Sequence, residues 1–139
     1  MIQIIAGEKG KGKTKILISK VNEEILDAKG DVVYLDKNNK HMYELSNKVR
    51  LINAKDFLIG NSDEFIGFIC GILSQDSDVE KIYVDSFLNV ACIKEEEVET
   101  VFKKLDHISD KFHVDFIISV SLNKRQIADS LHKDIIFAL

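Results

Sequence analysis

The chain has 139 residues, 45% of them apolar and 30% charged, a size and composition that predict one ordinary globular domain over residues 1–139. Its formal net charge of −4 gives no general electrostatic reason to bind nucleic acid or an anionic membrane, and no apolar run is long enough to span a bilayer. Because Cys70 and Cys92 lack metal-ligand spacing and the chain opens on a strand rather than a signal peptide, we expect a cytoplasmic protein with reduced thiols.

The first predicted element is a short buried strand at residues 2–6, and a glycine-rich segment follows it directly. That segment satisfies the pattern G-x-x-x-x-G-K-[ST] at every fixed position and reads Gly7-Glu8-Lys9-Gly10-Lys11-Gly12-Lys13-Thr14. In this pattern the glycines let backbone N–H groups turn toward a phosphate chain, the lysine reaches the terminal phosphates, and the hydroxyl ligates Mg²⁺. The pattern therefore predicts that these residues and Lys15 bind a nucleotide, and that Lys13 also acts in catalysis.

A helical pattern over residues 14–28 follows the glycine loop. Its apolar positions fall on one face and are Ile16, Leu17, Val21, Ile25 and Leu26. A strand, a glycine loop and a helix in this order favour a phosphate site, because the helix N-terminus adds a partial positive charge. The alternative interpretation of the segment is a lysine-rich surface turn.

The rest of the chain alternates between the two kinds of element. Strands are predicted at residues 31–35, 81–85, 114–120 and 135–138, with a brief extra strand at 49–52. Helices are predicted at residues 62–73, 94–112 and 123–131, with one or two helical turns near 42–45. This alternation, with strands apolar on both faces, predicts an α/β fold in which helices cover both sides of a parallel sheet. Ligands of such sheets bind outside the carboxyl ends of the strands.

Asp85 closes the predicted strand at residues 81–85. A carboxylate at this point, within reach of a phosphate loop, can hold the Mg²⁺ that Thr14 also ligates. The alternative is a strand-end carboxylate that accepts backbone N–H bonds in a turn. With the glycine loop upstream, we predict Thr14 and Asp85 as the metal pair.

Val84-Asp85-Ser86, with its apolar lead-in, resembles the Walker B strand of the RecA and KaiC-like ATPases in the P-loop NTPase superfamily. The order of elements is also similar, whereas specific residues match only at the two Walker motifs. The resemblance implies a P-loop NTPase fold, a three-layer sandwich with a mostly parallel five-stranded sheet. The order that it implies is 5-1-4-3-2, with the strands numbered along the chain.

The same family places a catalytic glutamate just beyond the second strand. Here Asp36 matches the strand-end carboxylate, but the glutamate position holds Lys37 or Asn38. The resemblance therefore implies one of two outcomes. Either Asp36 is the catalytic base, or it has a loop role and the domain turns ATP over slowly.

The family also carries a polar sensor at the end of the fourth strand. Ser119, Ser121 and Asn123 lie there, and Ser119 is the candidate for contact with the nucleotide. Which of the three points inward depends on the last pleat of the strand. Arg125, in the same loop, is a candidate arginine finger on a neighbouring subunit's phosphate; a surface role is its alternative.

The expected ligand is ATP with Mg²⁺. Asp85-Ser86-Phe87-Leu88 lacks the glycine of the guanine-nucleotide pattern Asp-x-x-Gly, and Asn123-Lys124-Arg125-Gln126 lacks the aspartate that pairs with guanine. Nucleotide kinases clamp two phosphate groups with several arginines, and this chain has only Arg50 and Arg125.

Three functions stay open at this point. The first is a slow Mg-dependent ATPase that acts through assembly into a homo-oligomer or through a protein partner. The second is a non-hydrolysing nucleotide sensor. The third is an ATP-dependent transferase, because residues 10–14 are similar to the loop of the corrinoid adenosyltransferases.

Overall fold

The computed structural model describes residues 1–139 and contains one six-stranded sheet. Its strands are β1 (Ile2–Ala6), β2 (Asp31–Asp36), β3 (Arg50–Asn53), β4 (Val79–Val84), β5 (Asp115–Val120) and β6 (Ile135–Ala138). The strand order is β3-β2-β4-β5-β1-β6, and every neighbouring pair is parallel. The predicted α/β fold and order are confirmed. The sheet has six strands rather than five because the brief strand β3 pairs with the outer side of β2.

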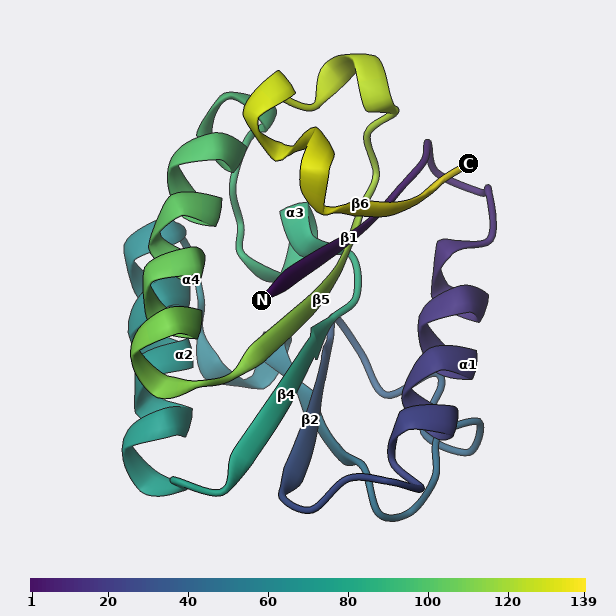
Figure 1. Cartoon of the computed structure of the whole chain (residues 1–139), viewed down its shortest axis with the longest axis vertical. Helices are drawn as coiled ribbons and strands as arrows, with labels where there is room; N and C mark the ends of the chain where they lie inside the picture. Colours follow the sequence, from purple (N-terminus) through teal and green to yellow (C-terminus); the bar gives the residue numbers. More distant parts are fainter.

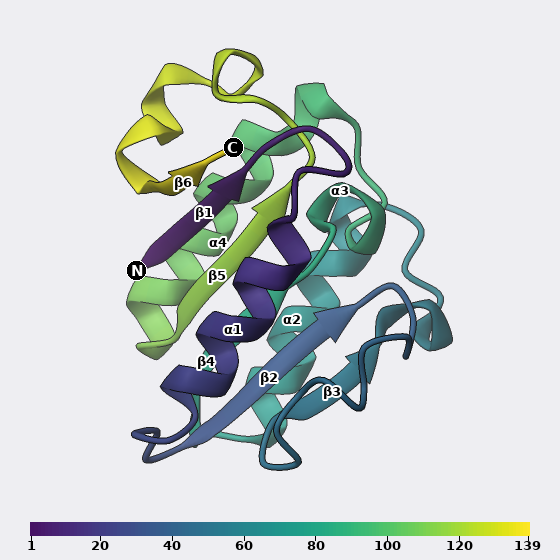
Figure 2. The same ribbon diagram turned by 90° about the vertical axis from the view of Figure 1, so that its right-hand side faces the viewer.

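Helices cover both faces of the sheet, so the fold has three layers (Figures 1 and 2). The helix α1 (Lys13–Glu24) lies on one face, and α2 (Ser62–Gln75) and α4 (Val98–Phe112) lie side by side on the other. A short helix, α3 (Phe87–Val90), follows β4 directly. None of the helices combines the length and the apolar character that crossing a bilayer requires.

The two faces of the sheet carry separate apolar cores. The core under α2 and α4 contains 28 buried residues, and the core under α1 contains 10. Strand alternation divides β2 between them: Val33 and Leu35 belong to the larger core, and Val32 and Tyr34 to the smaller. By the same alternation Asp36, two residues after Tyr34, also lies on the α1 side of the sheet.

Three expectations about helices are wrong. Residues 42–45 form hydrogen-bonded turns but no helix. Residues 123–131 form no α-helix but lie in the short 3₁₀ turns Lys124–Gln126 and Asp129–Asp134. The first turn closes on itself, because the side chains of Asn123 and Gln126 each accept the other's backbone N–H. Leu26 is 77% exposed rather than buried, since α1 ends at Glu24 and the chain turns away from the core.

Candidate functional site

The glycine loop connects β1 to α1 with little side-chain cover. Gly10 and Gly12 adopt φ angles of 88° and 92°, in the left-handed region where glycine is unstrained. A Cβ atom at either position would meet nothing within 4 Å, so the loop's inner surface is open to a ligand. Gly12 caps α1 without a side-chain hydrogen bond, which leaves first-turn N–H groups free for an anion.

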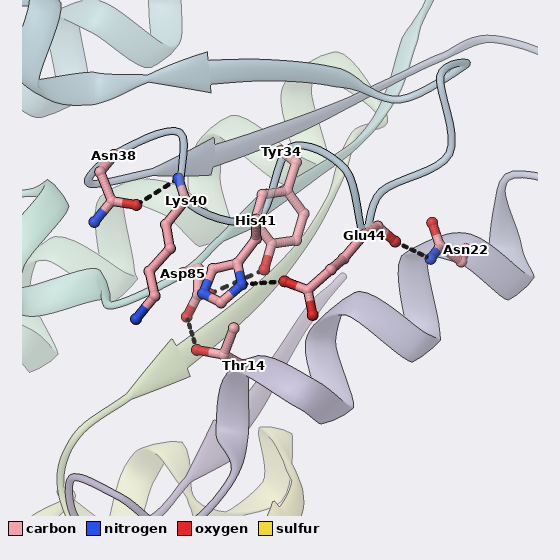
Figure 3. A network of polar contacts seen from close by, with 8 residues as sticks. All are labelled: Thr14, Asn22, Tyr34, Asn38, Lys40, His41, Glu44 and Asp85. Atoms are coloured by element: carbon pink, nitrogen blue, oxygen red, sulfur yellow. Dashed lines mark hydrogen bonds and ion pairs between the residues drawn. The ribbon is translucent and has the colours of Figure 1, made fainter.

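Lys13 and Thr14 are the first two residues of α1. The Lys13 side chain is 7% exposed, and its Nζ donates to the backbone oxygen of Glu8 at 3.0 Å. Burial lowers the pKa of Lys13, and the negative charge of Asp85 opposes that change. Thr14 Oγ1 donates to Asp85 Oδ1 at 3.2 Å, so the predicted metal pair is in direct contact (Figure 3).

Three hydroxyl groups fix the Asp85 carboxylate. Besides Thr14, Ser119 Oγ donates to Oδ1 at 2.8 Å and Tyr34 OH donates to Oδ2 at 3.0 Å. Ser119 Oγ also accepts the Ser86 backbone N–H at 2.8 Å. Tyr34 and Ser119 reach Asp85 because strand alternation turns both toward the α1 face of the sheet. The orientation of Asp85 is therefore set by the sheet itself.

A cleft of about 530 Å³ opens over these groups. It is lined by one apolar residue, Leu88, and by polar or glycine residues that are Lys9, Gly10, Gly12, Lys13, Thr14, Lys37, Asp85, Ser86, Asn89 and Ser121. Three lysines against one carboxylate give the lining an excess of positive charge, which suits a polyphosphate rather than an apolar ligand.

Several residues predicted for the site lie outside the cleft lining. They are Gly7, Glu8, Lys11, Lys15, Asp36, Ser119 and Arg125. Gly7 is buried against Leu139, whose Cβ would lie 3.0 Å from a Cβ at position 7. Ser119 is fully buried behind Asp85, whereas Ser121, two residues on, lines the cleft. Arg125 is exposed on its 3₁₀ turn and makes no ion pair.

Asp36 and Lys37 follow β2 and occupy different environments. Asp36 is 2% exposed; its Oδ1 accepts the Lys37 backbone N–H at 2.7 Å, and its Oδ2 has no partner. Burial, with the charge of Asp85, raises the pKa of Asp36. Lys37 is half-buried and lines the cleft. The next residue, Asn38, accepts the Lys40 backbone N–H and closes a local turn (Figure 3).

The protein groups fit a hydrated magnesium ion carried by a nucleotide. Mg²⁺ prefers oxygen ligands and is bound through one or two protein groups, with water and phosphate completing its shell. The hydroxyl of Thr14 and the carboxylate of Asp85 meet at the cleft and match that requirement. No group of three or more His, Cys, Asp and Glu side chains forms a metal-binding cluster, so these donors do not make an all-protein metal cage.

Sequence reasoning missed two contributors to this region. The sequence predicts Tyr34 only as part of a buried strand, although its position two residues before Asp36 puts it on the side of the sheet that faces α1. The short helix α3 supplies Leu88 and Asn89 to the cleft lining. Four residues are too few to produce a helical pattern, so the sequence does not predict α3.

The structure is similar to solved P-loop proteins with the RecA-like fold. A KaiC-like protein of the hyperthermophilic archaeon Pyrococcus horikoshii OT3 matches 85% of this chain and 61% of its own, with a TM-score of 0.60 and 17% identity. The flagellar accessory protein FlaH of Methanocaldococcus jannaschii matches 95% and 65%, with a TM-score of 0.59 and 14% identity.

At these identities the likeness shows the fold alone, and it is the RecA-like P-loop fold. This chain spans less than two thirds of either protein's length. No protein-family model and no curated protein matches the sequence.

Proposed function

We propose that this chain binds Mg-ATP at the cleft and is a slow ATPase that acts through a homo-oligomer or a protein partner. The observation that carries the proposal is the contact of Thr14 with Asp85 beside the buried Lys13, at the open end of a glycine loop. These are the three side chains that a P-loop site needs for the metal and the terminal phosphates. The fold shared with a KaiC-like protein and with FlaH is compatible with it.

Slow turnover follows from what surrounds the cleft. Asp36, the nearest candidate base, is buried outside the lining, and the residue beside it in the cleft is a lysine. Arg125 is exposed and does not line the cleft, so we expect it to act on a phosphate bound by another molecule. A general base contributes about 10²–10⁴-fold and an arginine finger about 10³–10⁵-fold. A monomer without either should turn over far below the typical ~10 s⁻¹ of enzymes.

A non-hydrolysing nucleotide sensor is the second candidate, and Lys37 is the observation that favours it. A cation just beyond the second strand, where the family has its glutamate near Lys37 or Asn38, cannot activate water, but it can hold a phosphate group. In that case ATP would order the site without being consumed, and a partner would respond to the bound form.

Thermal unfolding with and without Mg-ATP tests the proposal. A ligand at a hundred times its dissociation constant stabilises the folded state by about 2.7 kcal/mol, which corresponds to roughly 5–10 °C for a domain of this size. Lys13→Ala should fold normally and lose that shift. Equal shifts in the two proteins would contradict the proposed site.

Phosphate release then separates the two candidates. A rate that rises with protein concentration, and that Arg125→Ala abolishes, indicates an ATPase completed by assembly. A rate that stays negligible at every concentration indicates a sensor. A fast rate that is independent of protein concentration would contradict both candidates and would indicate that Asp36 acts as the catalytic base.

A further inference from the structure

We propose that Lys37 contacts the terminal phosphate of the bound nucleotide and makes the cleft select nucleoside triphosphates over diphosphates. This inference rests on the proposed nucleotide-binding function and goes beyond it, since it assigns the choice of phosphate number to one side chain. It depends on where Lys37 lies along the sheet, on the absence of a protein partner for its ammonium group, and on the charge of the cleft.

The position of Lys37 follows from the strand order. At the carboxyl edge of the sheet, the glycine loop follows β1, Asp85 follows β4, and Lys37 follows β2. In space these strands lie in the order β1, β5, β4, β2, so β5 separates β1 from β4. Neighbouring strands are about 4.8 Å apart, so the exit of β2 is roughly 14 Å from that of β1. Asp85 N donates to Leu35 O at 2.9 Å, which keeps the exits of β4 and β2 in register.

This order sets the direction in which a bound phosphate chain would run. The glycine loop holds the phosphates nearest the nucleoside, and the Thr14–Asp85 pair marks the position of the metal that bridges the last two phosphates. Lys37 lies on the far side of Asp85 from the glycine loop. A triphosphate that begins at the loop ends opposite Lys37, whereas a diphosphate ends one phosphate group short of it.

The ammonium group of Lys37 has no partner within the protein. Lys37 takes part in no ion pair, although its side chain lines the cleft. Its backbone is fixed, because its N–H donates to the buried Asp36 carboxylate at 2.7 Å. A positioned backbone that carries an unpaired cation into an anion-binding cleft is the arrangement expected of a phosphate ligand.

Lys9 and Lys13 supply the other positive charges of the lining, and both belong to the glycine loop side. The lysine at the position of Lys13 reaches both of the last two phosphates of a triphosphate, and ADP keeps one of them, so loss of Lys13 should weaken the binding of both nucleotides. Lys37 is the lysine of the lining that comes from the opposite wall, which is why the selection falls to it.

The test compares dissociation constants of Mg-ATP and Mg-ADP, measured by calorimetry on the whole chain. Lys37→Ala should weaken ATP binding by about 10-fold or more, the range of a hydrogen bond between charged groups, and change ADP binding by less than about 3-fold. Lys9→Ala is the matched control within the lining and should weaken both nucleotides alike. Lys40→Ala, an exposed lysine of the same loop outside the lining, should change neither.

Retention of the ATP preference in Lys37→Ala would overturn the inference while leaving the proposed function intact, as would an equal weakening of both nucleotides. Failure of the wild-type chain to bind either nucleotide would overturn the proposed function and this inference with it. If Lys37→Ala does not fold, Lys37→Gln, which keeps most of the alkyl stem, takes its place with the same expectation. Lys37→Arg keeps the charge and should retain the preference for ATP.

Discussion

The two faces of the sheet are built from the same strands but from different kinds of side chain. On the α2 and α4 face, the buried residues form one apolar core in which the ring of Phe87 packs edge to face against those of Phe65 and Phe102. On the α1 face, two buried tyrosines stack with ring centroids 6.1 Å apart, and both hydroxyls bond to carboxylates. Asp36, Asp85 and Ser119 lie on that second face as well.

This difference in side chains gives the two faces different roles, one mainly in stability and the other in the polar site. Apolar burial on the larger face provides most of the hydrophobic stabilisation, because it removes more apolar surface from water. The smaller face accepts buried polar groups, each of which needs a partner to avoid a desolvation cost. Substitutions on the larger face should therefore change the free energy of unfolding, and substitutions on the smaller face should change ligand binding.

Phe102→Ala should give the largest effect and act on stability alone. Phe102 is 1% exposed in α4, with its ring centroid 5.0 Å from that of Phe87. Loss of a buried phenylalanine costs about 3–5 kcal/mol of unfolding free energy. Denaturant titration measures that loss, and calorimetry on the folded fraction should give an unchanged affinity for ATP. A weaker affinity would show that the two faces are coupled.

The stacked tyrosines provide the next comparison. Tyr34→Phe removes the hydroxyl that bonds Asp85 Oδ2 and should cost about 1.5–3 kcal/mol of stability, the range for hydrogen bonds to charged groups. It should also weaken ATP binding in Mg²⁺ more than in EDTA, because Asp85 holds the metal in the proposed function. Tyr83→Phe is the matched control: its hydroxyl bonds Glu24, which keeps Lys81 and Lys20 as partners, so the Mg²⁺ dependence should not change.

The smallest expected effect is a change in the pH dependence of stability at Asp36. Its pKa in the folded chain lies above the ordinary value of 3.8, chiefly because of burial, so the folded state holds the proton more tightly than the unfolded state. As pH rises from 3.8 through the raised pKa, ionisation of Asp36 should destabilise the fold.

Asp36→Asn removes this dependence. We expect the free energy of unfolding of the wild type, relative to that of Asp36→Asn, to decrease as the pH rises from 3.8 through the raised pKa of Asp36. Denaturant titration without nucleotide or metal measures this difference. A difference that is flat with pH would mean that the folded and unfolded pKa values of Asp36 coincide.

Sequence reasoning predicted the elements whose signals are local. The glycine pattern predicts the loop at residues 7–14 and the helix after it, and apolar segments predict the strands and the α/β fold. The strand order came only from the resemblance to the RecA and KaiC-like ATPases. The sequence does not show how the alternation of side chains continues past the last apolar residue of the fourth predicted strand. For that reason the sequence does not show which of the three polar residues points inward, and Ser119 is the candidate. In the structure Ser119 supports Asp85, Ser121 lines the cleft, and Asn123 Nδ2 donates to Glu8 Oε1 at 3.2 Å.

The cleft's far wall was the least predictable part. Lys37 and Asn89 follow strands β2 and β4, and only the three-dimensional strand order brings them opposite the glycine loop. The 3₁₀ turns at residues 124–134 escaped prediction for a different reason. Their apolar spacing is that of a helix, but reciprocal capping by Asn123 and Gln126 ends the first turn before a helix can form.

The pairing of β1 has a consequence for the order of folding. Its neighbours in the sheet are β5 and β6, so the strand that leads into the glycine loop finds its first partner at Asp115–Val120. At a synthesis rate of about 5–20 residues per second, β1 waits roughly 5–20 s for that partner. The pairs β2·β3 and β2·β4 join segments much closer in sequence and can form earlier. The glycine loop should therefore be among the last parts of the chain to take shape, and if the proposed function holds, a nascent chain should gain protection by nucleotide only after β5 has emerged.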